Sequence, residues 1–326
     1  MAINIKSGYT GEALQTMLVA AFTGNEIVDK GLIHVQPNIS KNFYLPRIKP
    51  GKMLRKRVEQ PKDSDSKGDF TIDDKVLTPE EFMAFTTFNP RAFDHIWRKW
   101  QPTGELVFAE LPAEAQALML SEMAKTVQFE LGWHIINGEY AETGDDKLFN
   151  GILKRITEDV STVKITAPVA VTQSNVIETL GKIYKAIPKA IRSRADMRIL
   201  MSVEDFDKYD DALSALPAKG TAYTDTNAKR FKGITIETLC DMPENVIVAT
   251  IASSGVDSNL WLGVGDVDDQ TTVKIDRLEN AGERYFLKML MKADTQTAWG
   301  GQTVLYDGRS ADEEEDTADS QEESTI

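Results

Sequence analysis

The segment from Phe43 to Thr78 constrains the fold most, because it reads as a long hairpin with little apolar surface to bury. It starts with FYL, turns at DSDSKGD (residues 63–69) and returns through FTI. At about 3.3 Å per residue, arms of roughly fifteen residues reach some 50 Å from the rest of the chain. A two-stranded hairpin of this kind is marginal in isolation and exposes its edges. The segment therefore predicts that another copy of the chain receives it.

The first arm of this hairpin is basic, although the whole chain is acidic. Residues 47–62 contain seven Lys or Arg and one acidic residue, a net +6. The whole chain has 37 basic and 51 acidic residues, a net −14, and residues 309–326 hold eight acidic residues and one Arg, a net −7. Subtracting +6 and −7 from −14 leaves −13 for the remainder, which repels phosphate at long range and argues against general nucleic-acid binding.

We therefore expect the basic arm to contact the acidic surface of a neighbouring copy. A solvated hairpin without a partner and a direct contact with DNA are the alternatives. The candidate inter-subunit contact residues are Arg47, Lys49, Lys52, Arg55, Lys56 and Arg57.

The bulk composition is that of a soluble globular protein. The chain has 326 residues, of which 41% are hydrophobic and 27% charged, enough for a sizeable core. No apolar run approaches the ~18 residues of a membrane span, and the N-terminus lacks a signal-peptide pattern. The single cysteine, Cys240, excludes an intrachain disulfide and favours a reducing cytoplasm. We expect Cys240 to be a buried apolar filler beside a strand end.

Residues 112–137 form the clearest predicted helix, which begins at Pro112 and ends at Asn137-Gly138. At about 1.5 Å per residue, its length is roughly 40 Å. One apolar face recurs every fourth residue and a second strip lies beside it. The first consists of Met119, Met123, Val127, Leu131 and Ile135, and the second of Phe129, Trp133 and Ile136.

The rest of the chain mixes helices and strands. A short helix is predicted over residues 12–22, and residues 166–264 alternate helix and strand. Within that range Ser202, with Asp205 three residues on, is expected to cap the start of a helix. Residues 271–306 read as strands, while the acidic segment 309–326 is expected to be disordered. The aromatic-rich residues 79–108 are expected to form part of the core. This order predicts an α+β fold.

The order of elements resembles that of tailed-bacteriophage major capsid proteins with the Hong Kong 97-type fold. The hairpin resembles the family's extended loop, and the helix at 112–137 its spine helix. GDDKLFNGI (144–152) is similar to the turn that follows the spine. IPKAIRSRADMRILMSVEDFDKYDDAL and GITIETLCDMPENVIVA resemble two runs of the family's axial domain.

The resemblance implies a division of the chain into six parts. These are an N-terminal arm (1–42), the extended β-hairpin loop (43–78), a peripheral domain with the spine helix (79–165), an inserted axial domain (166–264), return strands of the peripheral domain (265–308) and an acidic tail (309–326). It also implies a self-assembling icosahedral shell of hexamers and pentamers around double-stranded DNA, bound without sequence specificity. A portal is another implied partner, and no membrane is expected. The protein would assemble in the host bacterial cytoplasm and reside in the virion. Because the N-terminal arm is short and lacks a long, charged helical segment of the fused-scaffold kind, we expect any scaffolding protein to be separate.

The residues give no convincing active site, so we expect neither catalysis nor a cofactor. His34, His95 and His134 lie far apart and share no metal-ligand spacing with Cys240. GVGDVDDQ (263–270) lacks the spacing of a calcium loop. No nucleophile elbow, P-loop or dinucleotide fingerprint is present. Two alternatives to a phage shell stay open: an encapsulin-like nanocompartment subunit, and a soluble enzyme of unknown chemistry.

Overall fold

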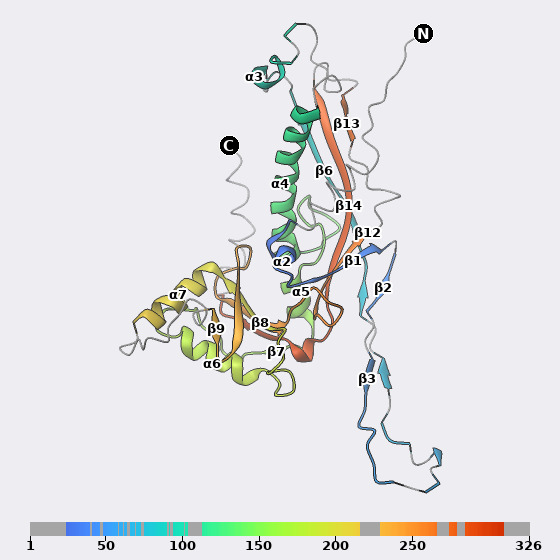
Figure 1. Ribbon diagram of the computed structural model, residues 1–326, viewed down its shortest axis with the longest axis vertical. Coiled ribbons are helices and arrows are strands. Elements are labelled where there is room, and N and C mark those ends of the chain that lie inside the picture. The colour runs from blue at the N-terminus through green and yellow to red at the C-terminus, as the bar shows by residue number, and fades with distance from the viewer. Residues whose placement is uncertain are drawn as a thin grey trace.

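The computed structural model describes an elongated molecule from residue 24 to residue 309 (Figure 1). Within that range, residues 40, 46–47, 58, 61, 64–65, 69, 73–74, 90, 92–93, 101, 104–112, 216–228, 266–273 and 279–283 are outside the described part. At residues 48–50, 70–72, 96–97, 113–120 and 274–277 only the backbone is described. The helix predicted over 12–22 and the disorder predicted for 310–326 therefore lie outside the described residues. No described helix is long and apolar enough to cross a membrane.

The first of two sheets has the long strand β14 (Tyr285–Thr297) at its centre. One edge of β14 pairs with β6 (Glu80–Phe88) over nine residues, and the other pairs with β13 (Lys274–Arg277) and β12 (Leu260–Gly265). β1 (His34–Ile39) adds to β12 in parallel. Alternate residues along the first half of β14 are buried, so this half has one covered face.

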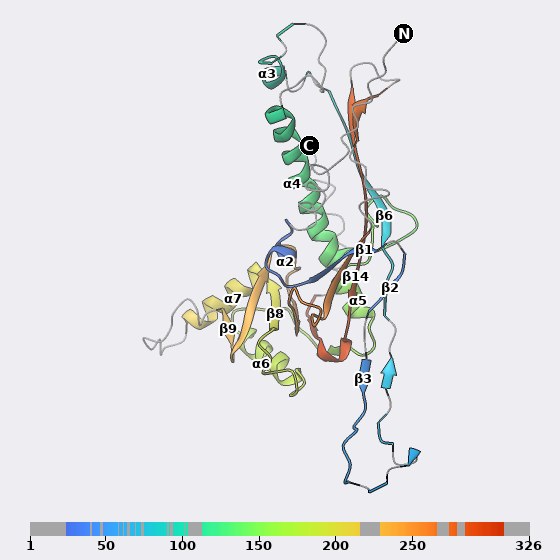
Figure 2. The ribbon, with the colours of Figure 1, turned by 45° about the vertical axis from the view of Figure 1, so that its right-hand side comes forward.

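Helix α4 (Ala113–Asn137) stands beside this sheet and confirms the predicted spine helix (Figure 2). Val127, Leu131 and Ile135 are buried in one core with residues of β14 and of helix α5 (Ile152–Glu158). Met123 is partly buried, and the side chain of Met119 is not described. The second apolar strip of the helix is only partly buried, because Ile136 is buried whereas 67% of Phe129 is exposed.

Two glycines let the chain fold back against the end of α4. The Gly138 amide donates to the His134 carbonyl over 2.9 Å, and the Gly151 amide donates to the Gly138 carbonyl over 2.7 Å. A Cβ atom on Gly151 would lie 2.7 Å from the Ile136 carbonyl oxygen. Only a residue without a side chain fits there, which explains the Asn-Gly-Ile sequence at 150–152.

The second sheet has the strand order β7-β15-β11-β8-β10-β9. Its central strands β8 (Met197–Ser202) and β11 (Val246–Ile251) are almost wholly buried, because both faces of the sheet are covered. One face packs on helices α6 (Val176–Ala186) and α7 (Val203–Ser214), and the other joins the core of the spine helix. The remaining strands are β7 (Val163–Lys164), β9 (Arg230–Phe231), β10 (Ile234–Leu239) and β15 (Val304–Asp307).

The predicted cap of α7 is confirmed, since the Asp205 amide donates to the Ser202 hydroxyl over 3.1 Å. The expected boundary at residues 264 and 265 does not coincide with the division between the sheets. β12, which the sequence-based division assigned to the axial domain, pairs with β14 in the first sheet. β15, placed among the peripheral return strands, pairs with β11 in the second sheet. Strand pairing joins residues distant in sequence, so position along the chain does not reveal it.

The aromatic-rich segment 79–108 is only partly a core element, contrary to expectation. Phe82 and Phe88 on β6 pack against the main core, but 52% of Phe85 and 58% of Met83 are exposed. These residues alternate along the strand, so the exposed ones point to the face of the sheet away from the core. Beyond β6, helix α3 (Asp94–Trp97) is short, and 43% of Trp100 is exposed.

Candidate inter-subunit contact surface

The base of the predicted hairpin is anchored to the first sheet. β2 (Phe43–Tyr44) pairs with β5 (Val76–Leu77), and Leu77 is fully buried in a small cluster with Trp261. Beside this cluster, the Thr78 amide donates to the Asp294 carboxylate over 2.8 Å. Burial raises the pKa of Asp294, and the nearby Arg155 guanidinium opposes that shift. The hairpin therefore begins from a fixed position on the body.

The outer part of the hairpin extends away from the body (Figure 1). β3 (Ile48–Pro50) and β4 (Phe70–Ile72) form three antiparallel pairs, which confirms the two-stranded excursion. Beyond them all the side chains at 51–57 are exposed, including 53% of Met53 and 93% of Leu54. Gly68 has a φ of +91°, and a Cβ atom there would lie 3.0 Å from the Lys52 carbonyl oxygen. A glycine at 68 thus lets the two arms approach each other.

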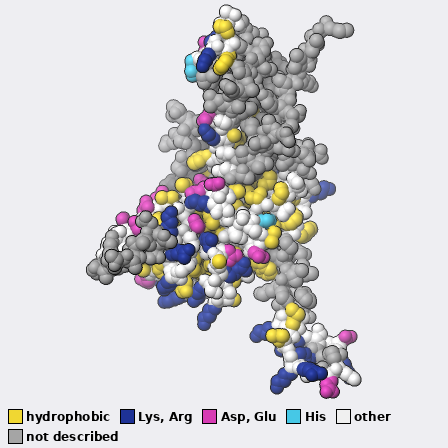
Figure 3. All heavy atoms as spheres, in the orientation of Figure 1, with side chains coloured by type: hydrophobic (Ala, Val, Ile, Leu, Met, Phe, Trp, Pro, Cys, Tyr) yellow, Lys and Arg dark blue, Asp and Glu magenta, His cyan; other side chains and the backbone are white. Residues whose placement is uncertain are grey.

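The basic residues predicted as contacts fall on this outer part. Lys52, Arg55, Lys56 and Arg57 are exposed within one continuous segment. Only the backbone of Lys49 is described, in β3 opposite Thr71, and Arg47 lies outside the described residues. In Figure 3, Lys and Arg side chains gather on the far end of the hairpin, which is separated from the body. The arrangement presents cations and two apolar side chains together, with little of its own chain around them.

A second feature, which we call the acidic junction, lies where the turn after β10 meets α4 and the short helix α2 (Glu26–Asp29). Burial, with the nearby Glu26 carboxylate, raises the pKa of Asp241 to about 6. Glu26 accepts hydrogen bonds from the Cys240 amide and the Lys30 ammonium, each over 2.7 Å. A Cβ atom on Gly132 of α4 would lie 2.8 Å from the Asp241 carboxylate. The junction packs tightly around a carboxyl group that binds its proton more strongly than a free Asp does.

Cys240 at this junction is exposed, so its predicted role as a buried filler is wrong. It follows the last residue of β10, in the turn where the Met242 amide donates to the Leu239 carbonyl over 3.3 Å. Partial burial and the Glu26 carboxylate raise the pKa of the thiol, which disfavours the reactive thiolate.

The three histidines form no common site within the described part of the chain. The Nδ1 atom of His34, in β1, lies 2.8 Å from the Ser254 carbonyl oxygen. His134 is buried on α4, where burial lowers its pKa, and His95 is exposed on α3. Among the described residues, no group of three or more His, Cys, Asp or Glu side chains is placed to hold a metal ion.

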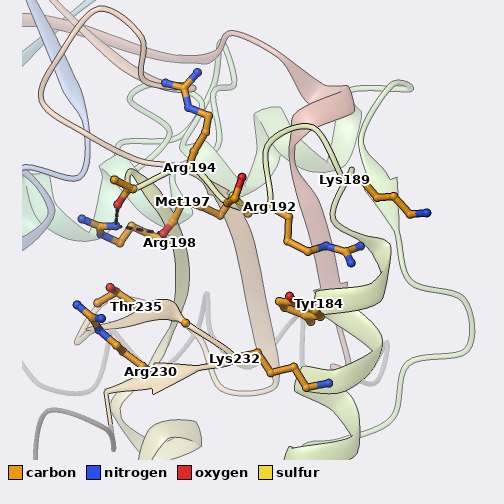
Figure 4. Close-up of a pocket in the computed structure, with 12 residues that line it drawn as sticks. Tyr184, Lys189, Arg192, Arg194, Met197, Arg198, Arg230, Lys232 and Thr235 are labelled. Atoms are coloured by element: carbon orange, nitrogen blue, oxygen red, sulfur yellow. Dashed lines mark hydrogen bonds between the residues drawn. The ribbon is translucent and has the colours of Figure 1, made fainter.

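A cluster of cations on the second sheet, which we call the basic cleft, was not predicted from the sequence (Figure 4). Its cations come from the loop after α6, the start of β8 and the turn between β9 and β10. The two runs KAIRSR (189–194) and KRFK (229–232) were the available signal, but they lie far apart in the chain. The cationic lining residues are Lys189, Arg192, Arg194, Arg198, Arg230 and Lys232.

Comparison with known proteins identifies the fold. No protein-family profile and no curated protein matches the sequence. The structure is similar to a chain of the "Satellite phage P4 procapsid including size determination (Sid) protein", with a TM-score of 0.57 and 12% identity, covering 90% of this chain and 98% of that one. It is similar to a chain of the "Capsid of empty GTA particle", with a TM-score of 0.55 and 12% identity, covering 94% of each.

A third similar structure is the "virus-like particle from Pyrococcus furiosus", with a TM-score of 0.52 and 11% identity, covering 90% of this chain and 98% of that one. All three likenesses extend over nearly the whole of both chains. The α+β, Hong Kong 97-type fold predicted from the sequence is thereby confirmed.

Proposed function

We propose that this protein is the major capsid protein of a tailed bacteriophage, the subunit of an icosahedral shell that encloses double-stranded DNA. The observation that carries the proposal is the fold, which matches capsid subunits over 90% or more of the chain and of its counterparts. Such a subunit acts by assembling with itself, in hexamers and pentamers, and not by catalysis. Its place is the virion, after assembly in the host bacterial cytoplasm, with a portal and a separate scaffolding protein as further partners and no cofactor.

The hairpin is the element we assign to contact between subunits. Its exposed cations suit an acidic neighbour, because the chain outside the hairpin arm and tail carries −13. The exposed Met53 and Leu54 add apolar surface that gains free energy only when a partner covers it. Charge attraction would guide the encounter of two subunits, and apolar burial would hold the finished contact.

The exposed face of the first sheet supports the same proposal. Met83 and Phe85 on β6 are exposed, and the Phe85 ring centroid lies 6.0 Å from that of Phe286 on β14. A face of this kind is unusual for a subunit that works alone. We propose that assembly covers part of it.

The direct test is whether the purified protein forms shells. Negative-stain microscopy and sedimentation should show capsid-sized particles or capsomers, and a protein that stays monomeric under all conditions contradicts the proposal. A nanocompartment subunit is the second candidate. Its shells would contain a co-purifying cargo protein and no nuclease-protected DNA.

A charge reversal tests the hairpin separately from the fold. Changing Arg55, Lys56 and Arg57 to Glu should leave the melting temperature unchanged and abolish or strongly slow shell formation. Early wild-type assembly should also weaken with salt, because exposed charges are screened over about 10 Å at 0.1 M. The matched control reverses three exposed cations elsewhere, Lys41, Lys125 and Lys182, and should assemble far better.

The alternative, direct contact between the hairpin and DNA, predicts a different result. The hairpin variant would then form normal empty shells without DNA and fail only in packaging. Formation of normal shells by that variant would contradict the proposal that the basic arm binds a neighbouring subunit.

A further inference from the structure

The basic cleft is a hollow of about 610 Å³ at one end of the second sheet. Figure 4 shows cations from several elements around it, with Arg230 and Lys232 on the β9 side and Lys189 and Arg192 after α6. This volume suits a bound segment or small molecule. It lies on the body, in a different part of the chain from the basic hairpin.

Only two of the six cations of the cleft are paired with carboxylates among the described residues. Arg194 binds Asp196 through two hydrogen bonds, of 2.6 and 2.8 Å, and Arg198 lies 3.8 Å from Glu237. No carboxylate of the described residues lies within ion-pair distance of Lys189, Arg192, Arg230 or Lys232. Within the described part of the chain, four positive charges around one hollow are therefore uncompensated, in a protein whose net charge is −14.

The cleft is held in place by contacts around Tyr184 of α6. The Arg192 guanidinium lies 4.7 Å and the Lys232 ammonium 5.1 Å from the centre of the Tyr184 ring. Arg192 also donates to the Ile187 carbonyl over 2.7 Å, closing the end of α6. Its Nε atom is buried and has no hydrogen-bond partner among the described residues. A buried donor without a partner and repelling cations held together both favour an anionic occupant.

We infer that the basic cleft binds the acidic C-terminal segment of the same chain, residues 310–326. This segment contains eight Asp or Glu residues and no Lys or Arg. Its charge exceeds the four uncompensated cations, so it can neutralise them. The segment contains little that is apolar, so its attachment would depend on charge and would weaken with salt.

The geometry of the sheet allows the segment to reach the cleft. The last described strand, β15, ends where Asp307 pairs with Val246, at the start of β11. The cleft lies at the other end of β11, where Ile251 pairs with Met197. About five residues of strand separate these two levels, or about 17 Å. A random coil of about 17 residues has a root-mean-square length of roughly 23 Å, which exceeds this distance along the strand.

A segment tethered at this length competes well with free anions. Its effective concentration is on the order of millimolar, so other polyanions must displace it before they bind. The segment would thus compete with nucleic acid and other polyanions for the cleft in the free subunit. This inference does not depend on shell assembly and can fail while the proposed function stands.

Carbodiimide crosslinking of the full-length, unassembled protein at low salt is the first test. It joins Lys amines to neighbouring carboxylates, and trypsin then releases residues 310–326 as one peptide because that segment lacks Lys and Arg. We expect this peptide to be attached to Lys189 or Lys232. Attachment only to lysines of the hairpin, or none at all, overturns the inference. A mixture of isotope-labelled and unlabelled protein shows whether each link lies within one chain, and links found only between chains also overturn it.

Proteolysis of variants is the second test, and it does not depend on the crosslinked lysines. In the cleft variant K189Q/R230Q/K232Q, a Glu-specific protease should cleave the C-terminal segment about fivefold faster at low salt, from the loss of three exposed ion pairs. The control K52Q/K56Q/R57Q removes the same charge from the hairpin and should cleave at the wild-type rate. Equal rates in both variants and the wild type contradict the inference.

Nucleic acid is the competing occupant. A fluorescent oligodeoxynucleotide should bind the full-length protein weakly at low salt, because the segment holds the cleft. Tight binding that the cleft variant loses, together with an absence of crosslinks to the segment, would assign the cleft to phosphate and overturn the inference.

Discussion

Two strand pairs of this molecule are both antiparallel, but they differ in how much of the chain packs around them. β6 and β14 pair over nine residues, with a helix-backed core on one face. β3 and β4 pair over three residues in the outer part of the hairpin, beyond which the side chains at 51–57 are exposed. The hydrogen-bond pattern alone therefore does not make a strand pair stable. The first pair is covered by a core of its own chain, whereas a short two-stranded ladder is marginal by itself, and under the proposed function a neighbouring subunit would support the second pair.

The largest effect should come from the core behind the first pair. Leu131→Asp places an unpaired charge at a position that is 2% exposed and should lower the free energy of unfolding by about 4 kcal/mol or prevent folding. The control Phe129→Ala, on the same helix at a 67% exposed side chain, should change it by under ~0.5 kcal/mol. Chemical denaturation measures both. A soluble, normally stable Leu131→Asp protein would contradict the comparison.

A smaller loss of stability should follow from removing the contact between the body and the base of the hairpin. Asp294 is 1% exposed and binds the Arg155 guanidinium over 2.9 Å and the Thr78 amide over 2.8 Å. Asp294→Ala leaves both donors without this acceptor and should cost about 3 kcal/mol. The exposed pair of Glu122 and Lys125 provides the contrast, since Glu122→Ala should cost under ~0.5 kcal/mol. Similar losses in both variants, by thermal or urea unfolding, would show that Asp294 is not an anchor.

At the acidic junction, ionisation of Asp241 should change the free energy of unfolding by about 1 kcal/mol as the pH changes, after allowance for solvent screening. Asp241 has a pKa raised from 3.8 to about 6, so between these values the folded protein binds more protons than the unfolded one. Its contribution to stability therefore falls as pH rises from about 4 to about 7. Asp241→Asn should remove this slope and stabilise the protein at pH 7. An unchanged slope, from urea unfolding across that range, would contradict the assignment.

Glu139 offers a control of opposite sign. Hydrogen bonding to Lys154 lowers the pKa of Glu139. The contribution of Glu139 to folding stability is therefore present at neutral pH and is lost as pH falls through the acidic range. Glu139→Gln should therefore cost a little stability at pH 7 and nothing at low pH.

The smallest effect on stability should come from the hairpin itself. Replacing residues 51–69 by Asn-Gly joins Pro50 to Phe70, which already pair, through a two-residue turn. The free energy of unfolding should change by under ~0.5 kcal/mol, because the described side chains removed are exposed. Shell formation should be lost. A fall of many degrees in melting temperature would mean that the hairpin stabilises its own subunit.

Local patterns in the sequence predicted the local structure well. The four-residue spacing of Val127, Leu131 and Ile135 located the spine helix and its buried face. Ser202 located the start of α7. Turn residues at 63–69 and the sparse apolar content of the first arm predicted the exposed hairpin. Each of these features depends on residues a few positions apart, where periodicity and capping act directly.

Features that depend on distant residues were not predicted. The sheet to which β12 or β15 belongs is decided by partners far away in the chain, and both strands are apolar enough for either sheet. Cys240 contacts Glu26 of α2 through its backbone amide, and its side chain is exposed. Arg192 and Lys232 meet only because both lie against Tyr184. Pairing at this range leaves no local pattern.

The long stretch of chain between β11 and its sheet neighbour β15 has a consequence for synthesis. β11, which is buried along its whole length, ends at Ile251, whereas β15, its neighbour in the finished sheet, begins only at Val304. At roughly 5–20 residues per second, translation of the intervening chain leaves that apolar edge unpaired for about 3 to 11 seconds. During this interval, VIVATI is a β-branched segment open to pairing with other chains. A protein made in large numbers at one time would be most vulnerable to aggregation here, and a chaperone that acts on nascent chains would have its natural point of contact at this strand.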